Sequence, residues 1–170
     1  MRRLLAPLLF PFFVAACHKD APPPPPPAAT PPLAKEEAPK ALAGDNVVTQ
    51  LQIESTNRPK GIVTVEQVIE GIDAMGKKFS HQQVVALSLK ARYCENGRTT
   101  IGLGMSICEF DDAEKAKAGR DRSIDVFKSF GKRKFALNGA TLVTLGEPAT
   151  SEIAADQEKF LEMFAKLTPR

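Results

Sequence analysis

Six consecutive prolines, Pro22 to Pro27, constrain the fold of this chain more than any other feature of its sequence. Nine of the 14 prolines lie between Pro22 and Pro39. Proline fixes its own backbone dihedral and has no amide hydrogen to donate, so this stretch cannot build a hydrophobic core. It favours polyproline II, in which Pro22 to Pro32 would span about 34 Å. The sequence therefore predicts a disordered, proline-rich linker over residues 17–44 and a single folded domain over residues 45–170.

An apolar segment precedes this linker. Met1-Arg2-Arg3 forms a short positive end, and the run from Leu4 to Ala16 is apolar. This run is too short to cross a hydrocarbon core of about 30 Å as a helix. A basic end followed by a short apolar run is typical of a secretory signal peptide. We therefore expect residues 1–16 to be a signal peptide that is removed on export.

The end of the leader, Val14-Ala15-Ala16-Cys17, resembles the lipobox of bacterial lipoproteins. The resemblance covers only about the first seventeen residues. It implies cleavage between Ala16 and Cys17, attachment of diacylglycerol to the Cys17 thiol, and acylation of the new amino group by a fatty acid such as palmitate. Two or three acyl chains anchor a protein almost permanently, because each buried methylene contributes about 0.8 kcal/mol.

This resemblance also implies a location in the cell envelope. In two-membrane bacteria an Asp after the lipidated cysteine favours retention in the inner membrane, and here the residue is His18. We therefore expect the outer membrane, facing the periplasm or the cell surface. The alternative is an ordinary secretory leader with a chance cysteine, and Pro7 and Pro11 within the apolar run favour it.

The composition argues against several functional classes. Without Arg2 and Arg3, 21 basic residues face 20 acidic ones, so no strong overall field attracts nucleic acid. The chain has no Trp, and His81 is the one histidine of the expected domain. A single imidazole cannot share a metal with a second one, as most zinc sites require. We therefore expect no nucleic-acid partner, no metal and no cofactor.

The pattern of the domain predicts an α+β fold. The expected elements are a strand over 47–53, a helix from Thr64 to Met75 with a capping box of Thr64 and Gln67, and strands over 85–93 and 101–107 around a turn at Asn96-Gly97. A helix over 111–130 capped by Asp111, a hairpin or kinked strand over 135–145 and a helix from about 151 follow. The order β-α-β-β-α-β(β)-α resembles a ferredoxin-like sandwich. This resemblance implies an antiparallel sheet of four to five strands with the helices on one face.

Cys94 and Cys108 are the only cysteines of the domain, and the sequence leaves their state open. An oxidising envelope favours a disulfide between them. The apolar alternation, however, pairs Tyr93 with Ile101 and Leu89 with Met105. That register separates the two cysteines by about 27 Å along the hairpin, far beyond the reach of a disulfide. Buried, unreacted thiols are therefore the alternative.

Four groups of residues are candidates for chemistry. The acidic residues Glu109, Asp111 and Asp112 could bind a cation, but a helix start also attracts carboxylates. Basic side chains at the end of the same helix could contact phosphate or lipid headgroups, but a helix end attracts cations as well: Arg120, Arg122, Lys128, Lys132, Arg133 and Lys134.

The other two groups are the segment from Gly102 to Ser106 and the single histidine. The glycine-rich segment lacks the spacing of a nucleophile elbow or a phosphate loop. His81 would need Cys94 or Ser80 as a nucleophile and an orienting group such as Asp112. None of these groups predicts a catalytic site.

The sequence therefore predicts a membrane-anchored envelope lipoprotein that is not an enzyme. Its domain would act as an interaction or accessory module for an envelope protein or peptide. The alternative is a small-ligand-binding or sensing domain with a pocket between sheet and helices, and an enzyme ranks third. A pocket of several hundred cubic ångströms with convergent polar groups would favour the ligand.

Overall fold

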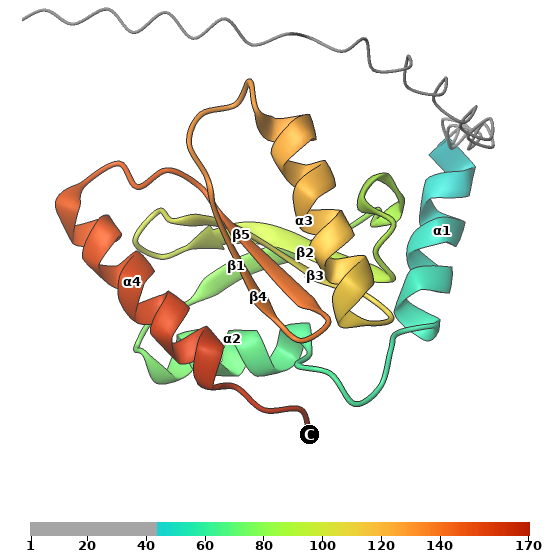
Figure 1. Ribbon diagram of the computed structural model, residues 1–170, viewed down its shortest axis with the longest axis horizontal. Coiled ribbons are helices and arrows are strands. Elements are labelled where there is room, and N and C mark those ends of the chain that lie inside the picture. Colours follow the sequence, from blue (N-terminus) through green and yellow to red (C-terminus); the bar gives the residue numbers. More distant parts are fainter. Residues whose placement is uncertain (1–43) are drawn as a thin grey trace, which may run out of the picture. The chain divides into compact units, whose positions relative to one another are not determined.

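A computed structural model describes residues 44–170 as an α+β arrangement of four α-helices and one five-stranded antiparallel sheet (Figure 1). The α+β class and the antiparallel sheet confirm the coarse fold prediction. The predicted signal peptide, the lipid site at Cys17 and the proline linker up to residue 43 lie outside the described residues. The elements are α1 (Gly44–Thr56), α2 (Val65–Ala74), β1 (Phe79–Val84), the 3-10 helix η1 (Leu87–Leu89), β2 (Tyr93–Thr99), β3 (Gly104–Glu109), α3 (Ala113–Phe127), β4 (Lys134–Asn138), β5 (Thr141–Leu145) and α4 (Ser151–Lys166).

The strands lie in the order β1-β2-β3-β5-β4, and every neighbouring pair is antiparallel. The segment 135–145 forms the tight hairpin, in which Asn138 pairs with Thr141 across Gly139 and Ala140. Gly139 has a φ of 57°, which a glycine adopts without steric cost. Between β3 and β4 the chain crosses over through α3, so β5 rather than β4 lies beside β3.

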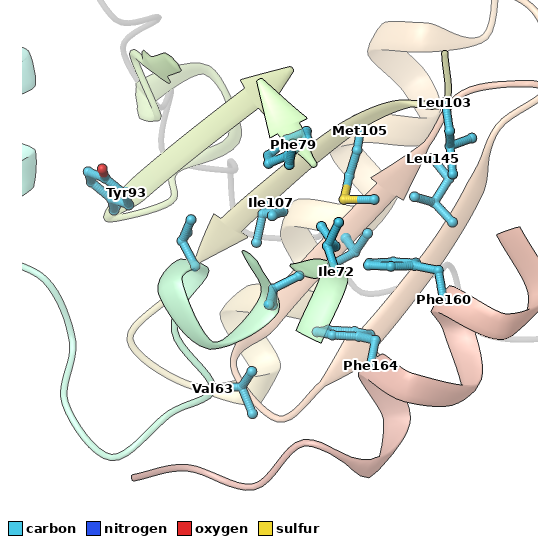
Figure 2. Close-up of a cluster of buried hydrophobic side chains, with 13 residues drawn as sticks. Val63, Ile72, Phe79, Tyr93, Leu103, Met105, Ile107, Leu145, Phe160 and Phe164 are labelled. Carbon is cyan, nitrogen blue, oxygen red and sulfur yellow. The ribbon is translucent and has the colours of Figure 1, made fainter. Parts of the chain in front are cut away.

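The helices cover both faces of the sheet, which corrects the prediction that they share one face. α2 and α4 pack on the first face through Val68, Ile72, Phe160 and Phe164, in a core that Figure 2 shows. α3 packs on the second face through Ala116, against Phe110 and Leu142. Successive residues of a strand point to opposite faces of the sheet. These strands have apolar residues on both faces, so helices are needed on both faces to bury them. The ferredoxin-like resemblance is thus supported only at the level of an antiparallel sheet combined with helices.

Side-chain caps start the three helices that follow α1. Thr64 and Gln67 form the predicted capping box at the start of α2. α3 begins one residue later than expected, because Asp112 rather than Asp111 accepts the Lys115 amide at 2.8 Å. Thr150 caps α4 by accepting the Ile153 amide at 3.2 Å. These caps satisfy amide groups that have no partner within the helix.

The predicted strand over 47–53 is wrong, because this segment lies within α1. The inward face of α1 contains Val47, Gln50, Leu51 and Glu54, at the spacing of a helix. Gln50 and Glu54 are polar, so the apolar residues alone do not show the helical period. Ile53, whose phase suggested a strand, is 51% exposed.

The predicted strand over 85–93 is also wrong in its bounds. The edge strand β1 lies earlier, at Phe79–Val84, and η1 follows it. The sequence Ser80-His81-Gln82-Gln83 has none of the β-branched or aromatic residues that are enriched in strands, which explains why the pattern did not indicate β1. Lys90, with a φ of 56°, reverses the chain after η1.

The register of the central hairpin differs from the predicted one. The turn lies at Thr99 to Leu103, with Gly102 at a φ of 91°, while Asn96 and Gly97 belong to β2. Tyr93 therefore pairs with Glu109 rather than with Ile101, and Cys94 lies opposite Cys108. Their α-carbons are 4.2 Å apart, and the two sulfurs form a disulfide. The predicted register is wrong, and so is the distance of about 27 Å that it implied, because the turn comes later in the chain than Asn96-Gly97.

Gly119 in the middle of α3 makes room for the fully buried ring of Phe110. A methyl group at Gly119 would lie 2.3 Å from Phe110 Cζ, well inside van der Waals contact. Gly71 in α2 provides a matched contrast. A methyl group there would lie 2.3 Å from Met163 Sδ, the flexible end of a side chain that can move aside.

We predict that Gly119→Ala lowers the free energy of unfolding by about 1 to 2 kcal/mol, because overpacking outweighs the gain of about 1 kcal/mol in helix propensity. Gly71→Ala should lie within about 1 kcal/mol of the parent or above it. Urea unfolding followed by circular dichroism measures both. Equal stabilities of the two variants would contradict the proposed packing of Phe110.

Candidate ligand-binding groove

The second face of the sheet is only partly covered, and the uncovered part forms a groove of about 750 Å³. α3 packs over β4 and β5 at the Leu142 end of this face. Further along, Asn96, Ser106 and Thr144 pair across three neighbouring strands and form a polar row on the groove floor. Gly104 and Gly146 flank this row without side chains. An apolar surface here would need a helix to cover it. Small and polar residues can face water, so the surface stays open as a hollow.

One end of the groove is apolar. The Cys94–Cys108 disulfide lies there, together with Val84 and Leu89. Both cysteines are 2% exposed, so the bond is part of the second core. This end offers a surface for an aliphatic side chain.

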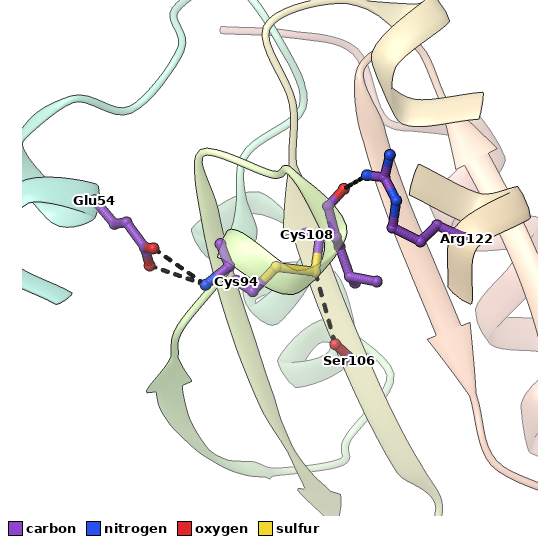
Figure 3. Close-up of a disulfide and its surroundings, with 7 residues drawn as sticks. Glu54, Cys94, Ser106, Cys108 and Arg122 are labelled. Atoms are coloured by element: carbon purple, nitrogen blue, oxygen red, sulfur yellow. Dashed lines mark hydrogen bonds between the residues drawn. A yellow bond between two sulfur atoms is a disulfide. The ribbon is translucent and has the colours of Figure 1, made fainter. Parts of the chain in front are cut away.

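The wall beside the disulfide is fixed by two polar contacts from different helices (Figure 3). The Ala86 amide donates to both carboxylate oxygens of Glu54 in α1, at 3.1 and 3.2 Å. Arg122 of α3 donates to the Leu89 carbonyl at 3.0 Å. Glu54 is only 5% exposed, and donors from the Ala86 amide and the Gln50 side chain satisfy its buried oxygens. The segment around η1 therefore has a defined position above the groove.

The other end of the groove is charged. Arg98, Arg133 and Glu147 line it. The Arg133 guanidinium lies over the Phe127 ring, 4.3 Å from its centroid, and its Nε is buried without a hydrogen-bond partner. Among residues 44–170, no carboxylate pairs with either arginine. This end has two guanidinium groups without an ion pair and one carboxylate, so its charge favours an anion.

A separate charged network lies on the first face of the sheet. Arg58 donates to both oxygens of the fully buried Glu109 and to both oxygens of Glu66. The Val65 amide also donates to Glu109, at 2.7 Å. The Arg58 guanidinium lies 4.1 Å from the centroid of the Tyr93 ring. These contacts fasten the segment before α2 to the ends of β2 and β3.

The network continues through Tyr93 to the edge of the sheet. The Tyr93 hydroxyl donates to Glu95, and His81 Nδ1 contacts the other oxygen of Glu95. The His81 ring also stacks on Phe79, with the centroids 5.3 Å apart. None of the side chains of this network lines the groove.

The electrostatics of this network follow from its contacts. The hydrogen bonds from Arg58 lower the pKa of Glu66 from 4.5 to about 2. Burial alone would lower the pKa of Arg58, but hydrogen bonds and the charges of Glu66 and Glu109 raise it above its ordinary value. Burial, followed by the hydrogen bond to Glu95, raises the pKa of the Tyr93 hydroxyl. The phenol therefore stays protonated at neutral pH.

The structure separates most of the residues that the sequence suggested for chemistry. His81 lies on the first face, while Ser80 and Cys94 line the groove on the second. Asp112 caps α3 and does not approach His81. Gly104 and Ser106 belong to β3 and lie on the groove floor, which is a role that their spacing did not indicate.

The acidic residues that the sequence grouped together also have separate partners. Glu109 binds Arg58, Asp111 pairs with Arg92 and Lys115, and Asp112 caps α3. Within residues 44–170, no group of three or more His, Cys, Asp or Glu side chains is arranged to hold a metal ion. No helix in this part of the chain is long and apolar enough to cross a membrane.

Sequence reasoning missed the groove itself. The row of Asn96, Ser106 and Thr144 depends on the register of three strands, which the sequence placed wrongly. The sequence also did not distinguish Arg133 from its basic neighbours. Only the structure shows that its guanidinium lies over the Phe127 ring. No known protein family, curated protein or solved structure matches this chain.

We predict that acid weakens the fold through Glu66. Its pKa is lowered in the folded state, so its contribution to stability is present above about pH 4.5 and is lost as the pH falls toward about 2. The carboxylate is half exposed, so this contribution is at most about 1 kcal/mol. Glu66→Gln should therefore lower the melting temperature at neutral pH and flatten its decline below about pH 4.5.

Glu70→Gln is the matched control, because Glu70 lies on the same helix and pairs with Arg170 instead of Arg58. Thermal melts of the parent and both variants across this pH range measure the effect. If the melting temperature of Glu66→Gln fell with acid as steeply as that of the parent, the result would contradict the role of Glu66 in the acid dependence.

Proposed function

We propose that this protein is an envelope lipoprotein, anchored through acyl chains on Cys17, whose domain is a non-enzymatic binding module. In this proposal the proline-rich segment separates the domain from the membrane. The sheet-face groove binds an extended peptide segment from an envelope protein. The outer membrane remains the proposed location, since His18 rather than Asp follows the cysteine.

The disulfide supports the exported location. Disulfides persist in oxidising compartments such as the bacterial periplasm and are rare in the cytosol. The two cysteines of the domain are paired and buried, so the bond belongs to the folded core. A domain with such a bond suits the compartment to which the proposed signal peptide would deliver it.

The observation that carries the proposed binding is the two-ended chemistry of the groove. Asn96 on its floor is exposed and makes no side-chain hydrogen bond with residues 44–170, so it is available to a ligand, and the Ser106 hydroxyl beside it is partly exposed. An Asn amide and a hydroxyl can each donate to and accept from a peptide backbone. Arg133 at one end can bind a carboxylate, and the disulfide end can accept an aliphatic side chain. The groove thus favours a peptide segment with an apolar residue close to a carboxylate.

We predict that metabolic labelling with an alkyne analogue of palmitate marks the full-length protein at Cys17. Cys17→Ser should lose the label and leave the membrane fraction. The double variant Cys94→Ala/Cys108→Ala is the matched control, because it removes the other two cysteines and should keep the label. A labelled, membrane-bound Cys17→Ser variant would show that the anchor lies elsewhere.

We predict that N-acetyl-leucine binds the groove more tightly than N-acetyl-leucinamide, which has the same apolar side chain without the charge. Backbone amide shifts of Gly104 and Gly146 in NMR titrations of the unlipidated Cys17→Ser chain would report binding. Loss of one charge-assisted hydrogen bond corresponds to about a tenfold weaker affinity. Arg133→Gln should remove the preference for the acid, while Arg120→Gln, which alters an exposed arginine of α3 outside the groove, should keep it.

Equal affinity of the two probes, or shifts confined to residues outside the groove, would contradict this ligand class. Shifts along β1 would instead favour a partner that adds to the sheet edge. In the described part of the chain, β1 pairs only with β2, and so its outer edge is the place where such a partner would bind.

A further inference from the structure

The end of α3 and the loop that follows it combine exposed apolar and basic side chains. Phe130 is 69% exposed, the largest value among the exposed large apolar residues of the described chain, and Ile124 is 46% exposed. The two phenylalanines Phe127 and Phe130 contact each other edge to face, with their centroids 6.2 Å apart. Phe130 is therefore held in place at the surface.

Basic residues surround this apolar tip. Between residues 124 and 134 the chain has four basic residues, Lys128, Lys132, Arg133 and Lys134, and a single acidic one, Asp125. Lys134 pairs with Glu158. Lys128 and Lys132 have no ion pair with any residue of the described chain and lie at the surface. A solvated helix end explains cations at this position, but it does not explain an exposed phenylalanine between them.

The position of the tip matches the side on which the described chain begins. In Figure 1 the N-terminal end of α1, at Gly44, and the loop after α3 both lie along the upper edge of the domain. The C-terminal end of α4 lies on the opposite side. A tether that enters at Gly44 would therefore present the tip, and not the end of α4, toward the surface to which it is attached.

We propose that Phe130, with Lys128 and Lys132, docks the domain onto an anionic lipid surface. The Phe130 ring inserts at the level of the headgroups, and the two lysines contact lipid phosphates. This inference rests on the proposed anchor at Cys17 for the orientation of the domain and for its local concentration at the surface. A tether of this length keeps the domain near the surface at an effective concentration on the order of millimolar, so weak docking is sufficient.

This docking would orient the groove. Arg133 follows Lys132 directly and lines the charged end of the groove. An anchored domain that rests on Phe130 would therefore hold its anion-binding end close to the membrane. A peptide from a membrane-associated protein would meet that end first.

The chain contains no Trp, so Phe130→Trp would create a single fluorescent reporter at the tip. The full-length lipidated variant is reconstituted into vesicles of phosphatidylcholine with or without phosphatidylglycerol. We expect a blue shift of the emission and quenching by brominated lipids only when phosphatidylglycerol is present. Both effects should be lost at about 1 M salt, where charges are screened within about 3 Å.

Two variants provide the controls. Ala165→Trp places the reporter at an exposed position near the end of α4, and it should emit as in water on all vesicles. Lys128→Glu/Lys132→Glu in the Phe130→Trp background should lose the shift without loss of vesicle association, because the acyl chains remain.

The outcomes separate the two proposals. A protein that does not stay with the vesicles would contradict the anchor at Cys17. Vesicle association of the Phe130→Trp variant with unshifted emission would overturn the docking surface alone, and so would equal quenching of the Phe130→Trp and Ala165→Trp variants. A shift with soluble polyglutamate but not with vesicles would assign the tip to an acidic protein and reject the lipid surface.

Discussion

The buried carboxylate of Glu109 is the interaction on which the arrangement of this domain depends. It lies at the end of β3, where Arg58 and the Val65 amide satisfy it, so it joins the segment before α2 to the centre of the sheet. A carboxylate without these partners would be very costly to bury. The same arginine lies on Tyr93, and Tyr93 reaches Glu95 and His81 at the edge strand. The network around this charged side chain thus links three strands and the entry to α2.

The groove exists because the two faces of the sheet are covered differently. Two helices fill the first face with Ile72, Phe160 and Phe164, while the single helix α3 fills one end of the second. A face that is left open must be made of residues that tolerate water, and Asn96, Ser106 and Thr144 meet this requirement. The groove therefore results from two features: α3 covers only part of the second face, and the strands have polar residues in the part that it leaves open. Its walls depend on Glu54 and Arg122, which come from helices far apart in the sequence.

The sequence predicted those parts of the fold whose signals are local. The α2 helix and its capping box at Thr64, the helix α4, and the hairpin at Gly139 each depend on a few neighbouring residues. The errors arose where the deciding contact is distant. The helix α1 buries Glu54 against the Ala86 amide, which no local pattern reveals, and the register of Cys94 depended on a turn that comes after the expected Asn96-Gly97. The candidate groove could not be predicted, because it depends on strand register and on a part of the sheet that α3 leaves uncovered.

The disulfide between Cys94 and Cys108 makes the floor of the groove depend on oxidation. If the chain is exported as proposed, it leaves the cytosol unfolded and with both thiols reduced. Pairing of the two strands places Cys94 opposite Cys108 and so brings the sulfurs within bonding distance. A newly made chain would therefore lack a finished recognition surface until it had crossed the membrane. This sequence of events would keep the groove from engaging cytosolic peptides during synthesis.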